Sequence, residues 1–89
     1  MKLTEVMALP DTERHLSSTA TVHRFLESLA IQHKQGWITD DEFKSYAVLT
    51  LKRGLAICEG DEPLATVIEA EGSALGKAIT ARQKAEAVV

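Results

Sequence analysis

Apolar residues recur at intervals of three and four along most of this chain, which is the periodicity of amphipathic helices. The first clear stripe occupies positions i, i+3, i+4, i+7 and i+8, and comprises Val22, Phe25, Leu26, Leu29 and Ala30. A helix over 19–35 is therefore predicted. Serine and threonine at 17–19 are typical N-cap residues and mark its start. Residues 11–16 are predicted to form a short helix or a turn.

A second helix is predicted over 40–59, with a stripe that comprises Phe43, Ala47, Leu51, Leu55 and Cys58. Val48, Leu49, Ala56 and Ile57 widen this stripe around most of the helix. Such a helix is usually buried, so it is either central to the fold or packed between a core and a partner. Gly54 lies in its interior, where glycine costs about 1 kcal/mol relative to alanine, and this predicts close approach of another helix.

The segment Gly36–Phe43 carries several independent signals for a corner between these two helices. Gly36 suits the C′ position that ends a helix. Thr39 and Glu42 have the spacing of a capping box, and Ile38 and Phe43 that of a hydrophobic staple. The acidic residues at 40–42 lie in a first helical turn, where the helix dipole favours negative charge. Capping therefore accounts for these acids better than a cation site does.

The rest of the chain also favours helix. Gly60 suits a C′ position, and Asp61 with Pro63 suits a new helix start. The apolar face that follows is predicted to comprise Leu64, Val67, Ile68, Leu75 and Ile79. Gly72 and Ser73 interrupt this segment, so residues 61–87 are either one kinked helix or two short ones. Residues 1–16 are predicted as an N-terminal arm or short helix.

These elements predict an all-α fold: a small helical bundle of three to five helices built on an antiparallel helical hairpin. Its 89 residues make one domain, 1–89, that is marginal alone. Together with the surplus apolar surface, this small size predicts a homodimer or a groove for a protein partner. The single cysteine favours a reducing, cytoplasmic setting. No signal-peptide pattern and no run long enough for a membrane span is present.

Residues 29–44 resemble the short C-terminal domain (SHOCT) family. The family pattern is a short helix, a Gly-x-Ile-Thr-Asp-Glu-Glu-Phe corner and a lysine-containing helix. The residues that match its corner are Gly36, Ile38, Thr39, Asp40, Glu42 and Phe43, with Asp41 where the family tends to have glutamate. The match lies mid-chain here rather than at a C-terminus. The resemblance implies a helical hairpin used in association and implies no enzymatic activity.

The sequence contains no catalytic, cofactor-binding or metal-binding motif, so no enzyme, cofactor or metal is predicted. His23 and Glu27 have an i, i+4 spacing that metal sites use, but such sites need three or four ligands. We interpret this pair as part of an exposed polar face. Cys58 lies on an apolar stripe near a helix C-terminus, where the dipole disfavours a thiolate. It is predicted to be a buried structural residue.

Two functional hypotheses remain. The first is a non-enzymatic protein-interaction module, a small regulator or inhibitor of the kind found in bacteria, phages and plasmids. Its predicted partner-binding residues are Trp37, Tyr46, Leu49 and Leu55. Trp37 is either such an anchor or a core residue that folds back on Phe43 or Phe25.

The second hypothesis is a small DNA-binding regulator of the helix-turn-helix type, in which Lys44, Lys52 and Arg53 contact phosphates. The acidic first turn at 40–42 and the net charge of −3 both oppose this reading, because nucleic-acid sites are usually basic.

Overall fold

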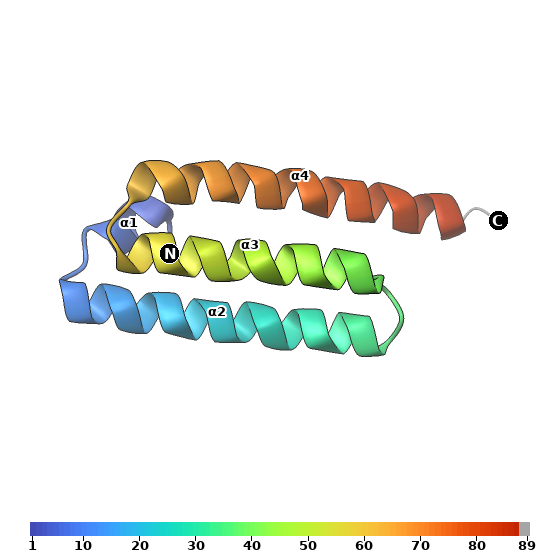
Figure 1. Ribbon diagram of the computed structural model, residues 1–89, viewed down its shortest axis with the longest axis horizontal. Coiled ribbons are helices and arrows are strands. Elements are labelled where there is room, and N and C mark those ends of the chain that lie inside the picture. The colour runs from blue at the N-terminus through green and yellow to red at the C-terminus, as the bar shows by residue number, and fades with distance from the viewer. Residues whose placement is uncertain (88–89) are drawn as a thin grey trace.

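The computed structural model describes residues 1–87, which form four α-helices in an elongated molecule of 50 × 22 × 19 Å (Figure 1). The helices are α1 (Leu3–Met7), α2 (Asp11–Lys34), α3 (Asp40–Cys58) and α4 (Glu62–Ala87). No strand occurs in the described part of the chain. The predicted all-α class and the antiparallel hairpin of the second and third helices are both confirmed.

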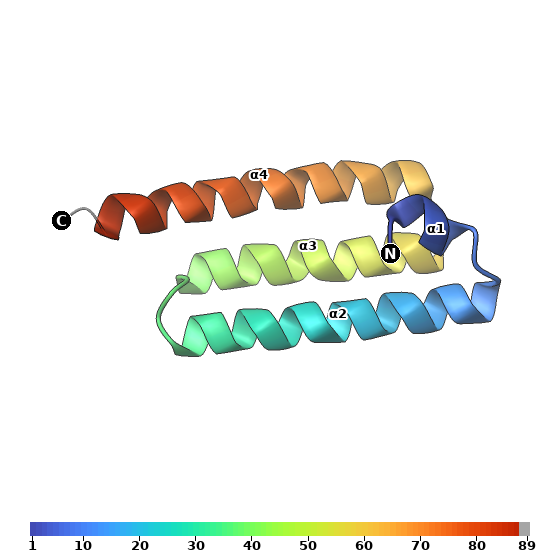
Figure 2. The same cartoon turned by 180° about the vertical axis from the view of Figure 1, so that it is seen from behind.

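Helix α3 lies in the middle of the molecule, antiparallel to α2 on one side and to α4 on the other (Figure 1). Helices α2 and α4 each pack along α3 but hardly touch one another. The short helix α1 covers one end of this three-helix layer, and Figure 2 shows it in front of the layer. As a result, α3 is covered on two sides only, and strips of its surface remain open on both faces of the layer.

Both interhelical corners form as the sequence predicts. Gly36 and Gly60 have φ values of 77° and 74°, in the left-handed region that glycine adopts without steric cost. In each corner the C′ and C″ amides bond back to the preceding helix, as in a Schellman motif. At the start of α3 the Glu42 amide donates to Thr39 Oγ1 at 3.1 Å, and the Thr39 amide donates to Glu42 Oε1 at 2.8 Å. The capping box is thus confirmed.

The predicted start of the first long helix is wrong. Helix α2 begins at Asp11, directly after Pro10, and continues through the serine and threonine cluster at 17–19. Ser18 is buried, and its hydroxyl donates a hydrogen bond to the Gly54 carbonyl at 2.8 Å. This hydroxyl therefore links α2 to α3, and it does not cap a helix.

The C-terminal segment is one continuous helix, so Ser73 does not begin a second one. Its cap is Asp61, as predicted, because Asp61 Oδ1 accepts from the Leu64 amide at 3.1 Å. Its predicted apolar face is partly wrong. Leu64 and Val67 are exposed, whereas Ala65 is completely buried against α1 and α3. A small side chain is needed there because neighbouring helices come close.

The core consists of two separate clusters. One lies where α1, α3 and α4 meet and contains Val6, Ala56, Ile57, Ala65 and Ile68. The other lies at the α2–α3 corner and contains Leu29, Ile38 and Ile79. Phe43 packs on the second cluster, as the predicted staple with Ile38 requires. Among residues 1–87, no helix is both long and apolar enough to cross a membrane.

Candidate interaction surfaces

A groove of about 570 Å³ runs between α2 and α4 over one face of α3. Val6 of α1 lines this groove, so the groove lies on the side of the layer that α1 occupies. Figure 2 shows α1 on that side. Tyr46 and Leu49, two of the predicted partner-binding residues, line the floor of this groove. Phe25 of α2 lines its wall and stays half exposed.

The interior of the groove is partly polar. Arg53 donates from Nε and Nη2 to Glu69 Oε1, at 2.8 and 2.6 Å, and thereby joins α3 to α4. The Thr50 hydroxyl donates to the Tyr46 carbonyl at 2.9 Å. Arg53 and Glu69 neutralise one another within the chain, so the groove presents a mixed polar and apolar surface.

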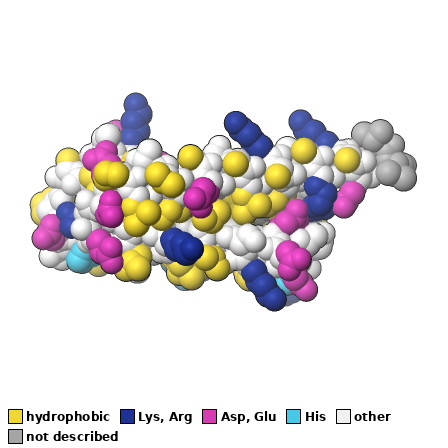
Figure 3. All heavy atoms as spheres, turned by 45° about the horizontal axis from the view of Figure 1, so that its top comes forward, with side chains coloured by type: hydrophobic (Ala, Val, Ile, Leu, Met, Phe, Trp, Pro, Cys, Tyr) yellow, Lys and Arg dark blue, Asp and Glu magenta, His cyan; other side chains and the backbone are white. Residues whose placement is uncertain are grey.

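The opposite face of the layer is apolar and open. We call it the α3–α4 face and define it by Val48, Leu51, Leu55, Leu64 and Val67. Each of these side chains is between 44% and 60% exposed. The three from α3 have i, i+3, i+7 spacing and thus share one stripe. Figure 3 views the molecule from this side, and yellow apolar side chains gather along the border of α3 and α4.

The predicted stripe of the second helix is only partly buried. Leu51 and Leu55 face solvent, as the alternative of a helix between a core and a partner allows, whereas Cys58, which was predicted to be buried, is only half buried. The reason is that α2 and α4 pack on other sides of α3, which leaves this stripe uncovered. Of the four residues that widen the stripe, Ala56 and Ile57 lie in the core, Leu49 packs against it and Val48 is exposed.

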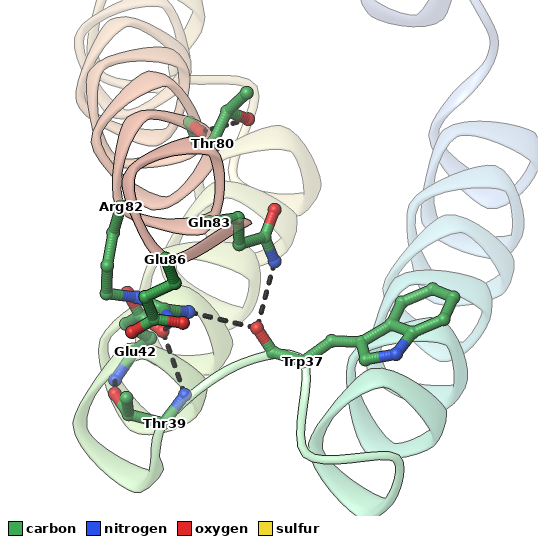
Figure 4. A network of polar contacts seen from close by, with 8 residues as sticks. Trp37, Thr39, Glu42, Thr80, Arg82, Gln83 and Glu86 are labelled. Carbon is green, nitrogen blue, oxygen red and sulfur yellow. Dashed lines mark hydrogen bonds and ion pairs between the residues drawn. The ribbon is translucent and has the colours of Figure 1, made fainter. Parts of the chain in front are cut away.

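Trp37 is not a core residue. Its side chain is 60% exposed, and the ring lies along the end of α2, away from α4 (Figure 4). A shallow hollow there is lined by Trp37, Ile31 and Gln35. The Trp37 carbonyl is held firmly, because it accepts from Arg82 Nη2 and from Gln83 Nε2, both at 2.9 Å.

Arg82 joins the end of α4 to the α2–α3 corner, a role that the sequence does not reveal. Its guanidinium donates to both carboxylate oxygens of Glu42 at 2.7 Å (Figure 4). Bidentate pairs of this kind are the strong, geometrically specific ones. The hydrogen bonds from Arg82, and then that from the Thr39 amide, hold the pKa of Glu42 below its ordinary value of 4.5. Glu42 therefore caps α3 and fixes α4 at once.

This pair predicts an acid-sensitive contribution to stability. Because the folded-state pKa of Glu42 is lowered, the contribution is fully present above pH ~4.5 and is lost as pH falls through the folded value. The gap in unfolding free energy between wild type and Glu42→Gln should shrink as pH falls from 7 to ~3. Urea denaturation at a series of pH values measures this gap.

Glu86→Gln is the matched control, since Glu86 also accepts from Arg82 Nη1 at 2.9 Å but is two-thirds exposed. Solvent screens such a pair, so this variant should follow the wild-type profile closely. A gap for Glu42→Gln that stays constant with pH would contradict the role given to the Arg82–Glu42 pair.

The three residues of the DNA-binding hypothesis do not form one surface. Lys44 and Lys52 are exposed on the side of α3 that carries the α3–α4 face. Arg53 lies about 100° further around the helix, in the groove and paired with Glu69. The structure thus separates the predicted phosphate contacts.

The remaining titratable groups form pairs and not clusters. His23 Nε2 and Glu27 Oε1 are 3.0 Å apart, and both side chains are largely exposed. His33 bonds to Asp40 across the corner, and this hydrogen bond lowers the pKa of Asp40. Within residues 1–87 there is no group of three His, Cys, Asp or Glu side chains that could hold a metal ion.

The four predicted partner-binding residues fall on three different surfaces: Tyr46 and Leu49 in the groove, Leu55 on the α3–α4 face, and Trp37 at the corner. Reasoning from the sequence missed Val48, Leu51, Leu64 and Val67 as surface residues. Their hydrophobicity indicated a core, and only the placement of the neighbouring helices reveals otherwise. Comparisons of the chain with family models, curated proteins and solved structures give no match.

Proposed function

We propose that this chain is a non-enzymatic protein-interaction module that acts by helix–helix docking, as a small cytoplasmic regulator or inhibitor. The observation that carries the proposal is the α3–α4 face, where five large apolar side chains from two neighbouring helices lie in contact with water. Soluble proteins rarely leave such groups together on their surface unless a partner covers them. The resemblance of residues 29–44 to an association domain supports the same role.

The form of this surface favours a helix as the ligand. The stripe on α3 and the side chains of α4 run parallel to the long axis of the molecule, so they form a long apolar track (Figure 3). An amphipathic helix binds such a track through its own residues at i, i+3, i+4 and i+7. Leu55 is the most exposed of the five residues of the α3–α4 face, and we assign it the central contact.

Leu55→Gln is expected to abolish stoichiometric binding while leaving the helical circular-dichroism spectrum and melting temperature nearly unchanged. The matched control is Leu16→Gln, because Leu16 is a leucine of similar exposure on α2, outside the α3–α4 face. Sedimentation of each purified chain and affinity capture from a native lysate together measure binding to self and to others. A wild-type chain that stays monomeric and retains no stoichiometric protein would refute the proposal.

A further inference from the structure

We infer that the α3–α4 face docks a second copy of this chain, with a two-fold axis that runs along the helices. The inference rests on the proposed function and names its partner. It starts from the register of α3 and α4, which three contacts define: Glu42 with Arg82, Tyr46 with Gly76, and Arg53 with Glu69. Each step forward along α3 is matched by a step of similar length backward along α4.

This register places residues of opposite charge at the same position along the long axis of the molecule, one on each helix. Lys52 adjoins Arg53 and therefore lies level with the segment just after Glu69, which contains Glu71. By the same rule Leu55 lies level with Val67. Both Lys52 and Glu71 are exposed, and neither forms an ion pair with any residue in 1–87.

Helical spacing puts both charges beside the apolar track. Lys52 follows Val48 by four residues, and Glu71 follows Val67 by four, so each shares a side of its helix with a residue of the α3–α4 face. The α3–α4 face therefore has an apolar centre with the unpaired cation Lys52 and the unpaired anion Glu71 beside it, while Lys44 lies about two turns nearer the start of α3. Figure 3 shows dark blue and magenta side chains on either side of the yellow band.

A two-fold axis parallel to the helices leaves the position of every residue along the helix axis unchanged. It brings α3 of one copy opposite α4 of the other. It places α3 of each copy antiparallel to α4 of the other, and the four helices together form a bundle. Lys52 then faces Glu71 of the partner subunit, and Leu55 faces Val67 of the partner subunit. Because such an interface is isologous, each of these contacts occurs twice.

This charge pattern is what distinguishes a second copy from an unrelated partner. A surface with a cation on α3 and an anion on α4 at the same position along the long axis is complementary to itself under this symmetry. In this arrangement each Lys52 faces Glu71 of the partner subunit, which favours this register over a shifted one. The area left open by α2 and α4 is covered at the same time.

The test is a pair of charge reversals, Lys52→Glu and Glu71→Lys, measured by sedimentation equilibrium at low salt. Each variant alone places like charges opposite one another at two points of its homodimer, so its dimer dissociation constant should rise about tenfold or more. An equimolar mixture of the two variants should dimerise nearly as well as wild type, because the heterodimer contains two opposite-charge pairs.

Lys77→Glu is the matched control for the change in net charge. Lys77 is exposed on α4, about 120° around the helix from Glu71, and lies outside the α3–α4 face. It should dimerise like wild type. Circular dichroism of all variants verifies that the helices are intact.

A mixture that dimerises no better than the single variants would overturn the inference, as would a wild-type dimer that neither reversal weakens. A wild-type chain that is monomeric at high concentration also overturns it. If that monomer still captures another protein in a manner that Leu55→Gln abolishes, the second copy is excluded as the occupant and the proposed interaction module stands.

Discussion

Replacing Ile57 with alanine is expected to lower the free energy of unfolding by about 2–5 kcal/mol. Ile57 is 2% exposed and is the largest side chain that is fully buried in the described structure. It lies in the cluster that joins α1, α3 and α4, together with Val6 and Ile68. Truncation removes buried methyl groups and leaves a cavity that three rigid helices cannot close. In a domain of this size such a loss is a large share of the total stability.

Leu55→Ala provides the matched comparison, because Leu55 lies two residues away on the same helix but is 60% exposed. Its truncation should change the unfolding free energy of the monomer by no more than about 0.5 kcal/mol. Urea denaturation at low protein concentration measures both variants without a contribution from association. Similar losses at the two positions would show that the two sides of α3 are equally buried, contrary to the structure.

The local features of this fold could be predicted from the sequence because each depends on neighbouring residues alone. The Schellman corners at Gly36 and Gly60 require only a residue that tolerates positive φ. The Thr39–Glu42 capping box depends on two residues three positions apart. Periodicity likewise identified the helical segments, although it left open whether residues 61–87 form one helix or two, because apolar spacing reports on helix formation before any tertiary contact is known.

Features that depend on the placement of whole helices could not be predicted in this way. Ser18 has the chemistry of an N-cap, and only the approach of α3 turns its hydroxyl toward the Gly54 carbonyl. Arg82 and Glu42 are 40 residues apart, so no spacing rule connects them. Leu51 and Ile57 are both apolar residues of one helix, yet one is exposed and the other buried, because α2 and α4 leave one strip of α3 uncovered.

The two open faces of α3 differ in a way that bears on function. In the groove, Arg53 and Glu69 neutralise one another within the chain. On the α3–α4 face, Lys52 and Glu71 remain available and border exposed leucine and valine side chains. In a specific interface, an apolar centre supplies the area that is buried on binding, and charged residues around it fix the orientation of the partner. The α3–α4 face has both.

Gly54→Ala is the second substitution with a large expected effect. The sign of its change in unfolding free energy tests the packing of α2 on α3. In an exposed helix this change stabilises by about 1 kcal/mol. Here a Cβ on residue 54 would lie 2.4 Å from Cγ2 of Val22, well inside contact distance, and 3.4 Å from Oγ of Ser18. Val22 is β-branched and has one strongly preferred rotamer in a helix, so it cannot turn away freely.

The helices must then separate, and Ser18 loses its bond to the Gly54 carbonyl. We expect Gly54→Ala to destabilise the protein by about 1–3 kcal/mol, as overpacking of a close helix contact does.

Gly72→Ala is the matched control, because Gly72 lies within α4 and an added Cβ there meets no atom within 4 Å. This variant should be more stable than wild type by up to about 1 kcal/mol. Thermal and urea unfolding of both variants measures the opposite signs. A second variant isolates the cause: Gly54→Ala combined with Val22→Ala removes the clashing methyl groups and should recover part of the loss. If Gly54→Ala alone were as stable as wild type, the 2.4 Å approach would not set the spacing of α2 and α3.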